Sequence, residues 1–269
     1  MHKLKTFVRY FKDFLQYGQI RLVLASVFYI LTGKSFIETR IFRGKLGFFL
    51  HRRGTLDFQF GNYAYEWNVK TIFNQHYKHY NVFIDVGANI GTYTIMLAGK
   101  GLRTYSFEPA YENFKALNIN ILLNNLEKNS TTYNLGLNNE NTKAAFAFDP
   151  LNTGASHIGT VQAETEEAEK RSITTEIQLI RLDEMMDKMN LDEKDRILMK
   201  IDVEGMEAEV LEGAENFIKN SHELFIVMES VHSGEEKLKS ILNRFAVFEY
   251  FPVDALNFAA RKIQNLNNK

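Results

Sequence analysis

Cysteine is absent from the 269-residue sequence, and proline occurs only three times. The absence of cysteine excludes disulfides, thiolate zinc sites and cysteine nucleophiles, although it leaves the cellular compartment open. With so few prolines and 13% aromatic residues, we expect a compact fold that contains β-sheet and has few rigid linkers. Because 32 Lys and Arg balance 33 Asp and Glu, the net charge gives no reason to expect nucleic acid as a partner.

The sequence also lacks an apolar run long enough to span a bilayer. The run at residues 22–31 has ten positions, whereas a spanning helix needs about 20. A signal peptide is not expected either, because the charged region before this run is long and residues 31–34 offer no small-x-small cleavage site. We therefore expect a cytoplasmic protein.

Residues 1–18 predict a basic amphipathic helix. Phe7, Phe11 and Phe14 recur at helical spacing, and lysines and arginines fill the positions between them. Such a helix can lie on the anionic inner face of a membrane, in which case the contact would involve residues 1–34. The alternative is that its apolar stripe packs on the domain behind it, and both interpretations stay open.

A β-hairpin is predicted over residues 46–60, where apolar residues alternate with polar ones after a turn at Gly54. The aromatic residues that follow at every second position from 63 to 67 indicate either a packed strand or a stacking wall for a ring-shaped substrate. We assign residues 1–79 to an N-terminal extension of helices and a β-hairpin, and residues 80–269 to the main domain.

From residue 81 onward, short apolar runs alternate with amphipathic segments of helical length, which is typical of a parallel sheet covered on both faces. The sequence thus predicts an α/β fold with a Rossmann-like, doubly wound, mostly parallel sheet of seven strands. The core strands are expected at residues 82–86, 104–107, 133–137, 197–203 and 224–228, with an antiparallel pair at 247–251 and 255–260 closing the edge.

The segment from Asp85 to Gly91 lies between a predicted strand and a predicted helix. Gly87 allows a sharp turn, and Gly91 allows the helix to approach closely, so a ligand can lie against bare backbone. The segment is not a Walker A motif, because no Gly-Lys-Ser/Thr follows, and it lacks the spacing of a dinucleotide fingerprint.

Glu108 ends the next predicted strand, where a carboxylate can accept two hydrogen bonds from a ribose diol. In the preceding loop, Asp85 and Asn89 can meet an ammonium and a carboxylate group. S-adenosylmethionine is the ligand that fits this combination. The alternative is that Glu108 only caps the helix that follows Pro109.

Several motifs resemble those of the FkbM-family methyltransferases. They are VFIDVGANIG (residues 82–91), FEP (107–109), LMKIDVEG (198–205), VLEGA (210–214) and VME (227–229). The resemblance covers about residues 80–232 and implies the class I methyltransferase fold. It also implies transfer of a methyl group from S-adenosylmethionine to an oxygen, often a hydroxyl of a sugar or natural product. The predicted cofactor-binding residues are Asp85, Gly87, Ala88, Asn89, Gly91, Glu108, Pro109 and Leu135.

Three residues are candidates for catalysis. Asp202, at the carboxyl end of the fourth core strand, is the expected general base or acceptor-orienting residue. Glu229 should lie on the neighbouring strand, where its pairing with Lys200 is an alternative, purely structural role. His157, on the loop after the third core strand, is a further candidate base, with an exposed loop histidine as the alternative.

The sequence leaves further alternatives open. A divalent cation held by Asp202, Glu204 and Glu229 would lower the pKa of the acceptor, but we do not favour it and predict no metal. His232 follows Glu229 by three positions, whereas the family shows two, so its role is open. The expected acceptor is a small molecule or glycan. Alternative functions are a non-catalytic module that binds S-adenosylmethionine and a nicotinamide-dependent oxidoreductase.

Overall fold

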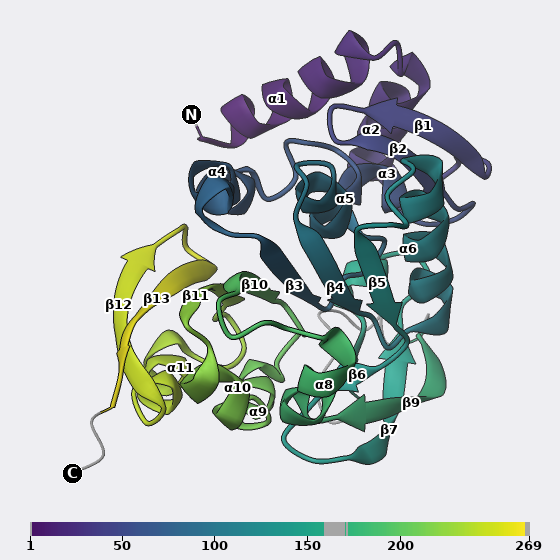
Figure 1. Cartoon of the computed structure of the whole chain (residues 1–269). Coiled ribbons are helices and arrows are strands. Elements are labelled where there is room, and N and C mark those ends of the chain that lie inside the picture. Colours follow the sequence, from purple (N-terminus) through teal and green to yellow (C-terminus); the bar gives the residue numbers. More distant parts are fainter. Residues whose placement is uncertain (1, 159–169, 171, 267–269) are drawn as a thin grey trace.

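The structure, a computed structural model, describes residues 2–158, 170 and 172–266. A seven-stranded sheet with the strand order β12-β13-β11-β10-β3-β4-β5 forms its centre (Figure 1). The five strands from β11 to β5 are parallel, whereas β13 is antiparallel to both β11 and β12. In chain order the strands are β3 (Val82–Val86), β4 (Arg103–Phe107), β5 (Ser130–Tyr133), β10 (Arg196–Ile201), β11 (Glu223–Glu229), β12 (Ala246–Pro252) and β13 (Asn257–Asn265).

The strand order reverses between β3 and β10. From β3 the chain adds β4 and β5 on one side, and it later returns to add β10 and β11 on the other. A reversal of this kind leaves a crevice at the carboxyl ends of the two central strands. The arrangement confirms the predicted doubly wound, mostly parallel α/β sheet.

Helices cover both faces of the sheet, which explains why β3 is buried along its whole length. Phe73 and Leu97 from the helices of one layer pack against Phe83 of the sheet. Leu211 and Phe217 belong to the core on the opposite face. The first layer holds α4 (Trp67–His76) and α5 (Thr92–Ala98), with α6 (Tyr111–Leu123) beside them; the second holds η3 (Leu182–Met185), α8 (Met186–Met189), α9 (Glu207–Glu212), α10 (Glu215–Asn220) and α11 (Glu235–Leu242) (Figure 1).

A second, four-stranded sheet follows β5, in the order β6-β9-β7-β8. The strand predicted at residues 133–137 is therefore misplaced, because the core strand ends at Tyr133 and the next two residues of strand belong to this second sheet. The side chain of Asn134 explains the break, since its amide donates hydrogen bonds to the carbonyls of Glu108 and Pro109 and turns the chain away from β4. The strands are β6 (Gly136–Leu137), β7 (Thr142–Phe148), β8 (His157–Ile158) and β9 (Ile173–Ile180), with η2 (Thr153–Ala155) between β7 and β8.

The N-terminal extension contains a hairpin, but not where the alternation predicted it. The two strands pair from residue 40 to residue 51, and Gly47, with φ +142°, begins the second strand directly after the turn. An added Cβ at Gly47 would be 2.2 Å from Asn124 Oδ1. Residues 57–60 form a short helix, in which Asp57 is buried and accepts hydrogen bonds from the backbone and guanidinium of Arg52. The elements are α1 (His2–Gln16), α2 (Ile20–Thr32), β1 (Arg40–Gly44), β2 (Gly47–His51), α3 (Asp57–Phe60) and η1 (Tyr77–His79).

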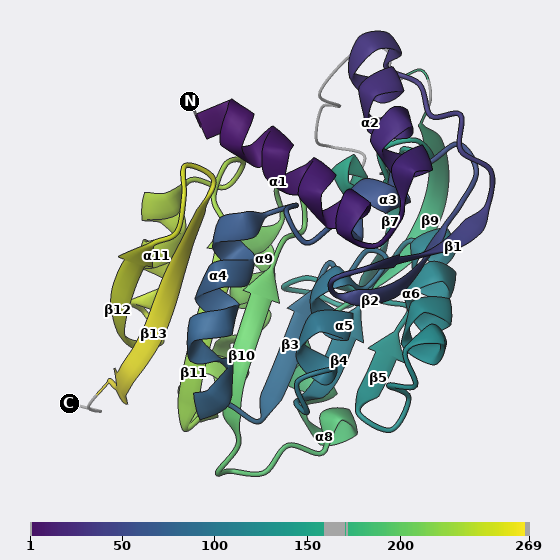
Figure 2. The ribbon, with the colours of Figure 1, turned by 90° about the horizontal axis from the view of Figure 1, so that it is seen from above.

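The extension packs on the α/β domain (Figure 2). Phe14, Leu22 and Phe58 share a hydrophobic cluster with Ile90 and Leu117, so one face of both α1 and α2 is buried. Among the described residues, no helix combines the length and the apolar character needed to cross a membrane. The division of the chain at residues 79 and 80 stays a prediction.

Candidate active site

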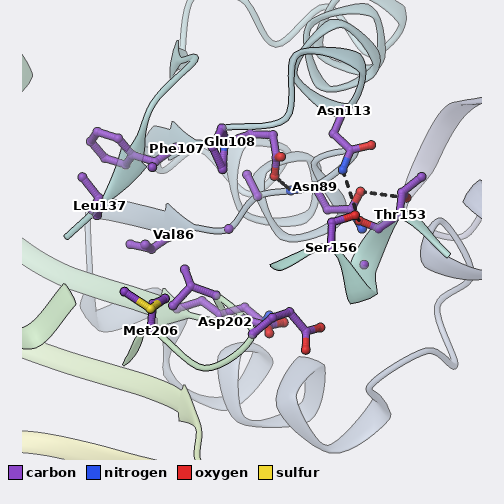
Figure 3. Close-up of a pocket in the computed structure, with 18 of the residues that line it drawn as sticks. Val86, Asn89, Phe107, Glu108, Asn113, Leu137, Thr153, Ser156, Asp202 and Met206 are labelled. Atoms are coloured by element: carbon purple, nitrogen blue, oxygen red, sulfur yellow. Dashed lines mark hydrogen bonds and ion pairs between the residues drawn. The ribbon is translucent and has the colours of Figure 1, made fainter. Parts of the chain in front are cut away.

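A cavity lies at the carboxyl ends of β3, β4 and β10, where the strand order reverses (Figure 3). It encloses about 920 Å³ of empty space, a figure that includes space open to solvent. Three parts of the chain enclose it: the loops that follow the core strands, the second sheet, and residues 60–66 of the N-terminal extension. Of the predicted cofactor-binding residues, Gly87, Ala88, Asn89, Glu108 and Pro109 line the cavity.

Gly87 brings bare backbone against the end of β10. Its φ is +82°, and an added Cβ would lie 1.9 Å from the carbonyl oxygen of Asp202. Gly91, with φ +89°, caps α5, where an added Cβ would lie 2.4 Å from Leu117 Cδ1. Gly91 thus allows α5 to approach α6 rather than the sheet, and it lies behind the cavity wall.

Glu108 is the acidic residue that the sequence predicts as the acceptor of hydrogen bonds from a ribose diol. Its side chain lines the cavity and is 4% exposed. Oε2 accepts a hydrogen bond from the backbone N–H of Asn89 (2.7 Å), and Oε1 accepts one from Ala110 N–H (2.9 Å). Burial raises the pKa of Glu108 to about 7. The residue therefore fixes the backbone just before α6 and also faces the cavity, where each carboxylate oxygen can accept a second hydrogen bond.

A chain of polar contacts forms the wall next to Asn89 (Figure 3). Asn89, with φ +48°, accepts a hydrogen bond from Thr153 Oγ1 (3.2 Å), and Asn113 Nδ2 donates to the carbonyl of Thr153 (3.3 Å). Arg52 of the extension donates to Asn113 Oδ1 (3.0 Å) while its guanidinium is paired with Asp57. The sequence gives no local signal for this wall, because its members are 40 to 64 residues apart.

Asp85 and Leu135 are placed behind the wall rather than on it. Asp85 is 1% exposed, and its Oδ2 accepts hydrogen bonds from the backbone N–H and the hydroxyl of Thr94. Burial raises the pKa of Asp85 to about 6. Leu135 packs against the core, while Gly136 and Leu137 reach the cavity. The structure thus gives Asp85 a role in fixing the start of α5 instead of the ligand contact that the loop pattern suggested.

The opposite end of the cavity is acidic. Asp202 lines it and forms an ion pair with buried Lys200, whose Nζ also lies 3.9 Å from Glu66 Oε2. Burial lowers the pKa of Lys200, but Asp202 and Glu66 outweigh it and hold the pKa above its ordinary value. The pairing of Lys200 with Glu229 is therefore not what the structure shows. Glu204 also lines this end, from a turn beyond β10 with φ +51°, so it does not continue the alternation of the strand.

Tyr65, Glu66 and Tyr93 complete this end of the cavity. Sequence reasoning missed Glu66 and Tyr93, and it offered Tyr65 only within the alternative of a stacking wall at residues 63–67. Tyr93 donates its hydroxyl hydrogen to Glu66 Oε2 (2.7 Å). Behind them, fully buried Lys70 donates to the carbonyl of Tyr65, and burial lowers the pKa of Lys70 to about 7. The aromatic run at 63–67 is thus not a strand, but Tyr65 does belong to the cavity wall.

Glu204, Glu229 and His232 form a group of possible metal ligands beside the cavity. One ligand atom each of Glu204, Glu229 and His232 lies within 4.8 Å of the others, and His232 Nε2 is 3.4 Å from Glu204 Oε2. Glu229 Oε2 is buried without a hydrogen-bond partner, and burial, together with the charge of Asp202, raises the pKa of Glu229 to about 8. The sequence suggested Asp202, Glu204 and Glu229 as the ligands of a possible divalent cation. In the structure, the residues that could hold such a cation are Glu204, Glu229 and His232.

The third catalytic candidate, His157, is in strand β8, where its backbone pairs with Ala147. Its side chain lies outside the described part of the structure. The catalytic roles of Asp202, Glu229 and His157 all remain predictions, and of the three only Asp202 is observed at the cavity wall.

Residues 85–253 match the family described as the methyltransferase FkbM domain, which is more than half of the chain. The chain belongs to the FkbM methyltransferase family. The resemblance drawn from the sequence motifs is therefore confirmed. A comparison with curated proteins gives no significant match.

Solved structures of methyltransferases are distant in sequence from this FkbM-family chain. An FkbM methyltransferase from Methylobacillus flagellatus KT is 17% identical, with a TM-score of 0.47, over 68% of this chain and 44% of that one. The chain thus spans less than half the length of that protein. An O-methyltransferase from Bacillus cereus, solved with S-adenosylhomocysteine, is 13% identical over 74% of this chain and 80% of that one (TM-score 0.41). Magnesium protoporphyrin IX methyltransferase from Synechocystis PCC 6803, with bound S-adenosylmethionine, is 10% identical over 74% and 79% (TM-score 0.43).

The family match does not cover the whole cavity. It begins at Asp85 and so includes Glu108 and Asp202, but it excludes Tyr65 and Glu66. The N-terminal extension therefore supplies walls at the acidic end that lie outside the shared FkbM domain.

Proposed function

We propose that the protein transfers the methyl group of S-adenosylmethionine to a hydroxyl oxygen of a small-molecule or glycan acceptor. The observation that carries this proposal is the placement of buried Glu108 at one end of a single cavity and the acidic group around Asp202 at the other. The first end suits a ribose diol, and the second suits a positively charged sulfonium with an acceptor hydroxyl beside it.

The adenosine half fits the wall formed by residues 87–89 and 107–109. Glu108 retains acceptor capacity beyond its two backbone hydrogen bonds. Gly87 presents no side chain, so a ligand can lie on the backbone as it does in other open α/β sheets. Phe107 and Leu137 line the same part of the cavity and offer apolar contact for a purine ring.

The charge of the opposite end fits a cation. Three carboxylates, those of Glu66, Asp202 and Glu204, face one lysine, Lys200, that is already paired with Asp202. An excess of negative charge in a partly enclosed site attracts a sulfonium and repels a phosphate. A nicotinamide dinucleotide carries a pyrophosphate that would have to lie close to these carboxylates or to Glu108. The electrostatics therefore support the methyl donor over the alternative of a nicotinamide-dependent oxidoreductase.

Methyl transfer requires that the acceptor oxygen, the methyl carbon and the sulfur lie in line, and that one group accepts the hydroxyl proton. A bond forms between the acceptor oxygen and the methyl carbon while the bond from carbon to sulfur breaks, and the sulfur leaves as a neutral thioether. The chain has to hold the acceptor in line and exclude water. Asp202 takes the hydroxyl proton, since its carboxylate lines the cavity and is held in place by Lys200.

Isothermal titration with S-adenosylmethionine tests the binding half of this proposal. We expect one site per chain, and we expect Glu108→Gln to weaken binding about tenfold or more, because a charged acceptor is lost to the diol. Glu112→Gln is the matched control, since Glu112 is at the start of the same helix but pairs with Lys115 at the surface. Equal affinities of the Glu108→Gln protein and the wild type would contradict the ribose assignment.

Transfer of a tritiated methyl group to hydroxylated cell extracts tests the catalytic half. We expect turnover by the wild type and a loss of about 100-fold or more in Asp202→Asn, which keeps the shape but cannot take the proton. Asp187→Asn, at an exposed position on α8, is the control. Binding of the donor without turnover on any extract would favour the non-catalytic module instead.

A further inference from the structure

Helix α2 is apolar on two opposite faces, but only one of them is covered. Leu22 and Ala25 are buried against the domain. Ile20, Leu24 and Leu31 recur at helical spacing on the opposite face, and they are 61%, 58% and 78% exposed. Val27 and Phe28 lie between them on this face and are also exposed. These five exposed side chains, Ile20, Leu24, Val27, Phe28 and Leu31, are called the α2 stripe below.

The α2 stripe is part of a larger exposed patch. Phe36 contacts Phe28 edge to face, with ring centroids 5.0 Å apart, and is itself half exposed. On α1, Val8 and Leu15 are also more than half exposed. Figure 1 shows α1 and α2 together at one end of the molecule, away from β12 and β13. Single exposed apolar side chains are ordinary, but the α2 stripe continues into Phe36, and an extended apolar surface of this kind marks a site that binds something.

The charge around the patch indicates what it binds. Residues 1–53 contain eleven Lys and Arg but only two Asp and Glu, whereas the whole chain contains 32 and 33. Of the two acidic residues, Asp13 is buried and Glu38 lies 3.6 Å from Arg53. Lys12 on α1, Arg21 on α2 and Lys34 just after α2 are exposed. The positive charge of the chain is therefore concentrated on the elements that expose the apolar patch.

We propose that α1 and α2 form a docking surface for an anionic lipid bilayer, in which the α2 stripe enters the headgroup region and the surrounding lysines and arginines contact lipid phosphates. A helix with an apolar face and a basic rim lies in the plane of such an interface. The 13 residues of α2 extend only about 20 Å, too short to cross the hydrocarbon. A second copy of the chain is a poor occupant, because it would bring two strongly basic surfaces together.

Docking to a bilayer does not depend on the methyl transfer reaction, but the docking surface and the cavity share one segment of the chain. The extension that carries the patch also supplies Tyr65 and Glu66 to the cavity wall. A bilayer bound to α1 and α2 would therefore be held by the same segment that encloses the acidic end of the cavity.

Sedimentation with lipid vesicles tests the proposal on the full-length protein. We expect the wild type to sediment with vesicles that contain phosphatidylglycerol, to bind vesicles of pure phosphatidylcholine much more weakly, and to be released as salt rises from about 0.1 M to 1 M. The double variant Leu24→Glu/Leu31→Glu should bind the anionic vesicles about tenfold or more weakly, because two exposed leucines no longer enter the interface.

Controls separate the loss of docking from the loss of the fold. Leu256→Glu changes a leucine that is 50% exposed, in the turn between β12 and β13, and should leave vesicle binding unchanged. The double variant should keep the melting temperature of the wild type, since neither leucine is buried. Arg21→Glu/Lys34→Glu should also weaken binding, and it alters no apolar contact of the stripe.

Three results would overturn the proposal. The first is a wild type that fails to sediment with anionic vesicles at low salt. The second is a double variant that sediments as well as the wild type. The third is a wild-type dimer in analytical ultracentrifugation that the double variant abolishes, which would make the patch an interface between two copies of the chain.

Discussion

Gly87→Ala is expected to disturb the point where the loop after β3 meets the end of β10. The added methyl group would lie 1.9 Å from the carbonyl oxygen of Asp202, so the two segments must move apart by more than 1 Å to reach a normal contact. Alanine at φ +82° adds a backbone cost of about 1–2 kcal/mol. Together we expect a loss of about 2–4 kcal/mol, within the range of severe single substitutions.

Gly101→Ala is the matched control for this substitution. Gly101 has φ +92°, close to that of Gly87, but an added Cβ would meet no atom within 4 Å. The control therefore carries the backbone cost alone, about 1–2 kcal/mol. The difference between the two variants measures the close approach of the loop to β10.

Thermal unfolding and titration with S-adenosylmethionine give the readouts. At about 2–4 °C per kcal/mol for a chain of this size, Gly87→Ala should lower Tm by roughly 4–16 °C and more than the control does. Donor affinity should fall about tenfold or more in Gly87→Ala, because the shift moves both Asn89 and Asp202, and it should stay unchanged in Gly101→Ala. Equal Tm values for the two variants, with donor affinity intact in both, would refute the reasoning.

Three further predictions follow from the same contacts. Burial raises the pKa of Glu108 to about 7, so this carboxyl group keeps its proton in the folded protein at pH values where it has lost it in the unfolded chain. The stability that Glu108 contributes therefore falls as the pH rises from about 4.5 to 7, while the affinity for the methyl donor rises over about pH 6 to 8 as the carboxylate forms. Titration calorimetry should show this rise in affinity in the wild type and its absence in Glu108→Gln. Arg52→Met removes the partner of buried Asp57 and the contact to Asn113, and should lower stability by about 3 kcal/mol on chemical denaturation, whereas Arg53→Met, at the exposed neighbour, should change it little. Treatment with EDTA should leave methyl transfer unchanged, because the proposed reaction uses Asp202 as the proton acceptor and needs no metal ion. Loss of activity that Mg²⁺ restores would instead assign Glu204, Glu229 and His232 to a metal.

The core of the fold was readable from the sequence because β3, β10 and β11 are short and mainly apolar. Val82–Val86 and Arg196–Ile201 are buried along nearly their whole length, so their composition alone identifies them. The third core strand was misplaced because its end depends on the contact between Asn134 and the β4 loop. The hairpin at residues 40–51 was missed because its turn is set by Gly47 packing on Asn124, a residue far along the chain.

The residues of the candidate site also differ in how far the sequence predicts them. Gly87, Asn89 and Glu108 belong to contiguous motifs at strand ends, where the fold dictates their position. Tyr65 and Glu66 come from a segment with no motif, and they reach the cavity only because α4 packs on the sheet. Asp85 belongs to the motif but not to the cavity, since the alternation along β3 turns its side chain toward Thr94.

The most direct test of the account is a crystal structure of the protein with S-adenosylhomocysteine. The account predicts the ribose hydroxyls within hydrogen-bond distance of the Glu108 carboxylate, with the sulfur directed toward Asp202 at the acidic end. A ligand bound elsewhere, or one whose ribose lies away from Glu108 in this cavity, would contradict it.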